Sequence, residues 1–213
     1  LFGKAYNDPL WEEYLDQFTE QQLIDLSAHG RYYSGRDYPA LGVSLEMNID
    51  GSDGLSNYPF HAEEFGELNA SGIGATAVLA ATWNKELAYR KGELIGNQSL
   101  WGSTKDGKRK TVGGWYAPAV NVHRSHFGGR NAEYYSEDGY FTGAMAAPTV
   151  EAARNYGVVT YVKHFAMNDA DTYRSNGTMW ADEQTMREVY FKGFEMCVKQ
   201  GNTLGIMSAT CRV

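Results

Sequence analysis

The chain alternates apolar runs typical of strands with longer segments of helical period, and this alternation restricts the folds open to it. The strand-like runs span residues 75–81, 115–122, 158–165 and 204–209. Helical periodicity follows the first three runs, over residues 84–101, 137–155 and 182–200. With the last start counted from residue 203, the strand starts lie 40, 43 and 45 residues apart. Uniform strand–helix units in this order predict a parallel sheet with right-handed crossovers.

The amino-terminal part adds an amphipathic helix pair over residues 9–28 and a short strand over residues 45–49, which makes about five strands. Five parallel strands suit either an open doubly wound sheet or the first part of an eight-stranded barrel of roughly 250 residues. No helix follows the run that ends at residue 209. We therefore predict an α/β fold that is the first part, about five βα units, of a TIM-type (β/α)8 barrel, incomplete in this chain.

Composition and charge exclude several classes of protein. Of the 213 residues, 43% are hydrophobic and 21% are charged, which is typical of a globular domain. No apolar run approaches the roughly 18 residues of a membrane span. A net charge of -7 argues against a nucleic-acid partner. Two cysteines exclude a disulfide framework, and we expect no signal peptide in these residues. The cellular location stays open, with a bacterial cytoplasm slightly favoured.

Polar side chains follow the expected strands where each strand ends. Asp50 sits in a glycine-rich turn after the first strand, and Lys163 and His164 end the strand over residues 158–165. An Asx-type turn would explain Asp50 without any ligand. Because active sites of α/β barrels lie at the carboxyl ends of their strands, these residues predict the rim of a pocket for a neutral, hydroxyl-rich ligand.

The segment after residue 122 carries Arg124, Arg130 and Glu133, which either hold a ligand or pair with one another to brace the barrel. The pattern leaves both alternatives open. The five histidines show no spacing typical of metal ligands, and no phosphate-binding loop follows a strand. We therefore predict no metal and no cofactor.

Taken in order, the strand-end segments resemble glycoside hydrolase family 3. The segments that carry the resemblance are residues 50–55 (DGSDGL), 81–84 (ATWN), 117–124 (APAVNVHR), 128–138 (GGRNAEYYSED), 163–168 (KHFAMN), Arg174, 186–188 (MRE) and 207–208 (MS). Ser52 stands where the family usually has proline. The resemblance covers nearly the whole chain.

The resemblance implies a retaining β-glycosidase that releases terminal β-D-glucose or xylose from oligosaccharides or aryl glycosides. In this chain Asp50, Arg124, Lys163 and His164 would bind the hydroxyls of a small carbohydrate substrate. Arg130, Glu133, Asn168 and Met207 would support that rim. The alternative is a barrel that binds carbohydrate without hydrolysing it.

The resemblance also implies that neither catalytic carboxyl group lies in this segment. The nucleophile of the family is an aspartate on a later barrel strand, which we expect downstream. Residues 1–28 would form a linker and an amino-terminal helical entry, and residues 29–213 the amino-terminal portion of the barrel domain. The expected partners are the remainder of the barrel and an α/β sandwich domain, and a homo-oligomer is compatible with the sequence.

Overall fold

The computed structural model describes residues 1, 3–28, 37–44, 46–56, 66–108 and 111–213. They form two compact units, Leu1–Asn48 and Ile49–Val213. Position 45 of the expected first strand and two of the five histidines, at positions 29 and 61, lie outside the described residues. None of the described helices is long and apolar enough to cross a membrane.

The smaller unit contains the predicted helix pair, as α1 (Leu10–Leu15) and α2 (Glu20–Ala28), followed by the 3-10 turn η1 (Pro39–Leu41). The hydroxyl of Tyr14 donates to the carbonyl of Leu41 over 2.8 Å. Phe18 is buried and meets the rings of Tyr14 and Tyr38 edge to face. Aromatic packing therefore joins the helix pair to the turn that follows it.

A parallel sheet organises the larger unit. In the described residues its strands are β1 (Met47–Asp50), β2 (Val112–Tyr116), β3 (Val159–Phe165) and β4 (Gly205–Ser208), in the spatial order β1-β2-β3-β4. Strand order equals chain order, and the β2–β3 and β3–β4 pairs are parallel, as expected for consecutive βα units. The predictions for residues 158–165 and 204–209 are confirmed.

The predicted strand over residues 75–81 is wrong, because this segment is the helix α4 (Thr76–Ala81). A continuous apolar run cannot distinguish a buried helix from a buried strand, and alanine favours the helix. The run at 115–122 is also corrected. Strand β2 ends at Tyr116, and after Pro118 the chain rejoins the sheet only through a bridge from Ala119 to Lys163. Proline has no N–H for the ladder.

The long helices begin at side chains that cap them. Asn84 accepts from the backbone N–H groups of Glu86 and Leu87 at the start of α5 (Lys85–Trp101). Asp138 caps α6 (Gly139–Asn155) and Asp182 caps α7 (Glu183–Thr185). Each cap satisfies N–H groups that a helix leaves free. The helix predicted to continue to residue 200 has a π-helical segment, η3 (Met186–Tyr190), before α8 (Lys192–Lys199).

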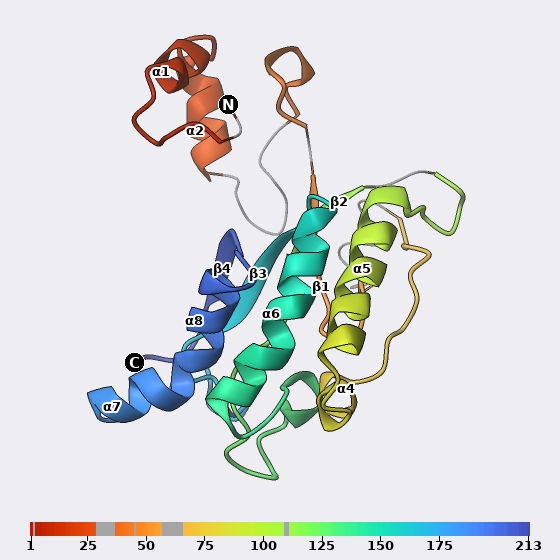
Figure 1. Ribbon diagram of the computed structural model, residues 1–213. Coiled ribbons are helices and arrows are strands. Elements are labelled where there is room, and N and C mark those ends of the chain that lie inside the picture. The colour runs from red at the N-terminus through yellow and green to blue at the C-terminus, as the bar shows by residue number, and fades with distance from the viewer. Residues whose placement is uncertain (2, 29–36, 45, 57–65, 109–110) are drawn as a thin grey trace. The chain divides into compact units, whose positions relative to one another are not determined.

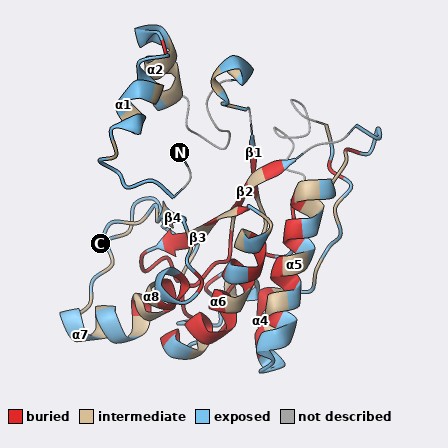
Figure 2. Cartoon of the chain, turned by 45° about the horizontal axis from the view of Figure 1, so that its top comes forward, coloured by how far each residue is buried: buried red, intermediate tan, exposed pale blue. Residues whose placement is uncertain are grey.

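Helices α5, α6 and α8 lie side by side along one face of the sheet (Figure 1). Residues coloured as buried run along these helices (Figure 2), and α6, which packs against both α5 and α8, has the most of them. Close approach of α5 to α6 requires Gly92, since a Cβ there would lie 2.3 Å from the carbonyl oxygen of Thr149.

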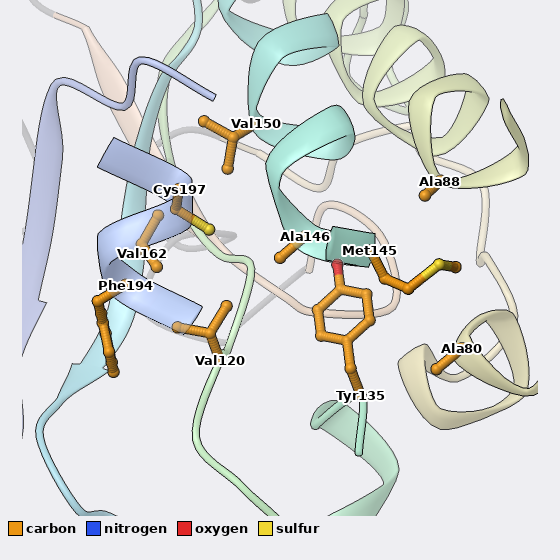
Figure 3. Close-up of a cluster of buried hydrophobic side chains, with 10 residues drawn as sticks. All are labelled: Ala80, Ala88, Val120, Tyr135, Met145, Ala146, Val150, Val162, Phe194 and Cys197. Carbon is orange, nitrogen blue, oxygen red and sulfur yellow. The ribbon is translucent and has the colours of Figure 1, made fainter. Parts of the chain in front are cut away.

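The main core fills the space between the sheet and these helices. Figure 3 shows Val162 of β3 and Val120 pointing toward Phe194 and Cys197 of α8, with Met145 and Val150 from α6. Successive side chains of a strand point to opposite faces, so Val162 in this core directs Lys163 away from it. The packing of the outer layer thereby orients the lysine of the candidate site.

Candidate active site

The candidate site lies at the carboxyl ends of the parallel strands. Asp50 is the last residue of β1, and Lys163 and His164 stand in the last three positions of β3. The long segment after β2, which runs to the start of α6, supplies Glu133 and Arg130. Since parallel strands end at the same edge of a sheet, residues far apart in sequence meet here.

Lys163 is the centre of a charged cluster. Its ammonium nitrogen lies 2.5 Å from Oδ1 of Asp50 and 3.7 Å from Oε2 of Glu133, and the residue is only 2% exposed. Arg130 contacts the other carboxylate oxygen of Glu133. A buried cation is tolerated when carboxylates surround it. The structure therefore brings together four of the predicted site residues, Asp50, Lys163, Arg130 and Glu133.

The turn after β1 holds Asp50 in a fixed conformation. Oδ1 of Asp50 accepts from the backbone N–H of Gly51 over 2.7 Å and also contacts the ammonium of Lys163. An Asx turn would need the N–H two residues on, so this bond to the next residue is not the Asx-type turn. The indole N–H of Trp115 donates to the carbonyl of Gly51 over 2.8 Å. Gly51 has a φ of 129°, and a Cβ there would lie 2.0 Å from the carbonyl oxygen of Gly54. Only glycine fits this turn.

His164 is held by an amide. Its backbone N–H and its ring Nδ1 donate to Oδ1 of Asn121, over 2.8 and 3.2 Å, and the Asn121 amide nitrogen donates to the carbonyl of His164. Burial lowers the pKa of His164 to about 2, with smaller effects from the cations Arg130, Lys163 and Arg174. The imidazole is neutral at pH 7. With Nδ1 donating, Nε2 is a hydrogen-bond acceptor.

Asn168 and Tyr134 lie below this rim. The hydroxyl of Tyr134 donates to the backbone carbonyl of Asn168 over 2.6 Å, and the Asn168 amide nitrogen donates to that hydroxyl over 3.4 Å. Burial raises the pKa of Tyr134, so its hydroxyl keeps its proton. Asn168 is thus held by Tyr134, and its support of the rim stays a prediction.

Two predicted residues occupy different surroundings. Arg124 is exposed and lies over the ring of Tyr190, with its guanidinium carbon 5.7 Å from the ring centre. It makes no ion pair in the part of the chain that the structure describes. Met207 is half-buried on β4. The structure thus places Arg124 against the segment preceding α8 and apart from the lysine cluster.

Several residues of the site were not singled out from the sequence. The hydroxyl of Ser52 donates to Glu133 over 3.0 Å, and Asn121 fixes His164. Asp169, directly after Asn168, is 4% exposed. A buried polar residue inside an apolar run is tolerated only when it is hydrogen-bonded. The position of Asn121 within the run over residues 115–122 therefore indicates a structural hydrogen bond. Among the described residues no group of His, Cys, Asp or Glu could hold a metal ion.

A parallel α/β sheet with a paired, buried lysine at the carboxyl ends of its strands defines part of a TIM-type barrel with a polar pocket rim. The family model described as glycosyl hydrolase family 3 N terminal domain matches residues 65–213. The chain therefore belongs to glycosyl hydrolase family 3.

Two curated relatives and two solved structures illustrate the similarity. The chain is 32% identical to Beta-glucosidase B of Emericella nidulans over 198 residues, which covers 93% of this chain and 22% of the relative. It is 31% identical to Beta-glucosidase A of Butyrivibrio fibrisolvens, with 89% and 22% covered.

Beta-glucosidase 3B from Thermotoga neapolitana in complex with glucose is 30% identical, with a TM-score of 0.78 over 94% of this chain and 29% of that chain. The Kluyveromyces marxianus beta-glucosidase in complex with glucose is 26% identical, with a TM-score of 0.81 over 95% and 23%. The chain thus spans between a fifth and a third of the length of these proteins.

Proposed function

We propose that these residues form the sugar-binding rim of a retaining β-glycosidase that releases terminal β-D-glucose, or xylose, from oligosaccharides or aryl glycosides. Asp50, Lys163 and His164 contact the hydroxyls of the terminal sugar. Arg124 contacts the substrate from the outer edge of the rim, and Arg130, Glu133 and Asn168 hold the inner residues in place.

The observation that carries this proposal is the Lys163 cluster beside a neutral His164. A sugar hydroxyl is both donor and acceptor, and the rim offers it a carboxylate acceptor, an ammonium donor and an imidazole acceptor. Lys163 is fixed by Asp50 and Glu133 at 2.5 and 3.7 Å, so its donors need no reorganisation when a ligand arrives. Preorganised polar groups of this kind are what a binding site for a small polar ligand requires.

The chemistry needs two carboxyl groups about 5 to 5.5 Å apart, one acting as nucleophile and the other as acid and base. In our proposal neither belongs to these residues, because Asp50 and Glu133 are both engaged by Lys163. An aspartate on a later barrel strand attacks the anomeric carbon. The rim then contributes through hydrogen bonds that shorten as the sugar ring flattens toward an oxocarbenium-like transition state.

The relatives support this assignment. Those quoted above are named beta-glucosidases, and two of the similar structures are glucose complexes. Because those proteins are three to five times as long as the matched segment, we propose that the rest of the barrel and an α/β sandwich domain complete the enzyme.

The test compares the full-length polypeptide containing these residues with its Lys163→Met variant. We expect the variant to bind glucose at least about tenfold more weakly and to lose about a hundredfold or more in kcat/KM on an aryl β-glucoside, since buried charged hydrogen bonds are removed. Lys199→Met, on the exposed surface of α8, is the control. Unchanged kinetics in Lys163→Met would refute the assignment. A wild-type protein that binds glucose without hydrolysis would be a carbohydrate-binding protein instead.

A further inference from the structure

A second buried lysine lies outside the site just described. Lys91 belongs to α5, in the outer layer of helices, yet it is only 4% exposed. Its ammonium donates to the hydroxyl oxygen of Thr76, at the start of α4, over 3.1 Å. Among the described residues this neutral group is its hydrogen-bond partner. Burying an ammonium without a carboxylate in contact opposes folding.

The contacts of Lys91 lead to the turn that holds Asp50. The Thr76 hydroxyl lies 3.5 Å from the backbone carbonyl oxygen of Ser52, to which it donates. The Ser52 hydroxyl donates to Oε2 of Glu133 over 3.0 Å, and the same oxygen lies 3.7 Å from the ammonium of Lys163. A continuous series of polar contacts therefore joins Lys91 of α5 to Ser52 in the turn after Asp50, and from Ser52 through Glu133 to Lys163.

The ammonium determines the direction of these hydrogen bonds. Lysine has three donors and no acceptor, whereas a threonine hydroxyl has one proton and two lone pairs. Lys91 forces the oxygen of Thr76 to accept, so the Thr76 proton is directed to the carbonyl of Ser52. With a neutral apolar side chain at position 91, the hydroxyl would be free to rotate away.

We propose that Lys91 is a positioning residue for sugar binding: through Thr76 it fixes the backbone of Ser52, and thereby the orientation of the Asp50 carboxylate toward the ligand. This inference rests on the proposed function of Asp50. It predicts that Lys91 contributes to the geometry of the turn and not to stability.

The charges around Lys91 are consistent with this role. Burial lowers its pKa to about 8, and Asp53 of the same turn acts in the opposite direction. Helix α4 supplies the neutral Thr76, and strand β2 contains no charged residue. On α6, Glu151 is exposed and Arg154 is half-buried. The hydrogen-bond partner of the Lys91 ammonium is therefore the neutral hydroxyl of Thr76. Because its pKa is about 8, Lys91 loses its proton in mildly alkaline solution.

The test uses Lys91→Met, Thr76→Val and the double variant in the full-length protein, with Lys85→Met as a matched control on the exposed surface of α5. We expect Lys91→Met to melt at or above the wild-type temperature, because an unpaired buried charge is removed. It should nevertheless bind glucose about tenfold more weakly and lose about tenfold in kcat/KM on p-nitrophenyl β-D-glucoside. Thr76→Val should lose as much, and the double variant no more than either single variant.

Each outcome decides between a positioning and a structural role. Kinetics of Lys91→Met within about twofold of wild type, while Lys163→Met is impaired, would overturn the proposal. A melting temperature several degrees lower, with activity per folded molecule unchanged, would show a structural role and overturn it as well. The wild-type kcat/KM should fall as the pH rises through about 8, because Lys91 loses its proton there. The pH profile of Lys91→Met should not show this decrease.

Failure of the proposed function is distinguishable. If the wild-type protein neither binds glucose nor hydrolyses the glucoside, the function is refuted, and the positioning role is then judged from the crystal structure of Lys91→Met. A displaced turn at residues 50–55 would support the role. A turn that superposes on the wild-type turn would overturn it.

Discussion

Replacing Asp169 by asparagine should make the protein more stable at neutral pH. Asp169 follows Asn168 at the carboxyl end of β3 and is 4% exposed. Its carboxylate lies near the backbone N–H of Val122, which favours the ionised form, but Oδ1 has no hydrogen-bond partner among the described residues. Burial raises the pKa of Asp169 to about 6, although the Val122 N–H and the charge of Arg124 act against the rise. The ionised carboxylate therefore destabilises the folded state.

The magnitude follows from the two pKa values. A rise from 3.8 to about 6 corresponds to about 3 kcal/mol, at roughly 1.4 kcal/mol for each pH unit. Because the folded pKa lies above the unfolded one, the contribution of Asp169 to stability is full below about pH 4 and is lost as the pH rises through about 6. Asparagine keeps the acceptor for Val122 but buries an amide N–H₂ group, which costs part of the gain. We expect a net stabilisation of about 2 kcal/mol above pH 7.

Urea unfolding of wild type and Asp169→Asn, measured between about pH 4 and pH 8, tests this reasoning. The free energy of unfolding of Asp169→Asn minus that of wild type should be about -1 kcal/mol at about pH 4, where only the cost of the buried amide remains, and should rise to about 2 kcal/mol by pH 8. Glu151→Gln, an exposed carboxylate on α6, should show no such growth. If this difference between variant and wild type stays constant with pH, or falls between pH 4 and pH 8, a buried, ionised Asp169 is refuted.

Three further substitutions test the turn, the core and a helix cap. Gly51→Ala forces a Cβ to within 2.0 Å of a backbone oxygen, so we expect a loss of more than about 2 kcal/mol in urea unfolding together with weaker glucose binding. Phe194→Ala removes a ring that is 3% exposed in the main core and should cost about 3 kcal/mol, with a lower melting temperature in calorimetry. Asn84→Ala removes both cap hydrogen bonds of α5 and should cost about 1 kcal/mol, whereas Asn84→Ser should restore most of it.

Local signals in the sequence were sufficient for most of the fold. The helices α5 and α6 begin within two residues of the predicted positions because Asn84 and Asp138 cap them. The run at 75–81 was misassigned since its alanines form a helix that buries only Thr76 and Ala80. The π-helical segment Met186–Tyr190 was not predicted, because a single turn with i→i+5 bonds is too short to establish a period of its own in the apolar pattern.

The candidate site was predictable only where a strand end identified it. Asp50 and Lys163 meet as expected because parallel strands end at one edge. Arg130 and Glu133 pair with each other, and Glu133 also lies near Lys163, which agrees with the bracing alternative. That these residues hold a ligand stays a prediction. The role of Ser52 depends on a contact 81 residues away in the chain, and no local pattern encodes such a contact.

The two faces of β3 explain why the site and the core depend on each other. Val162 belongs to the core under α6 and α8, and the next side chain, Lys163, points to the opposite face toward Asp50. Backbone displacement in β3 therefore moves the ammonium of Lys163 relative to carboxylates that other elements hold in place. A buried ion pair at 2.5 Å depends steeply on its geometry, so core substitutions around Val162 should weaken ligand binding before they unfold the domain. The outer layer of helices thus supports the proposed binding site, because its core residues hold β3 in place.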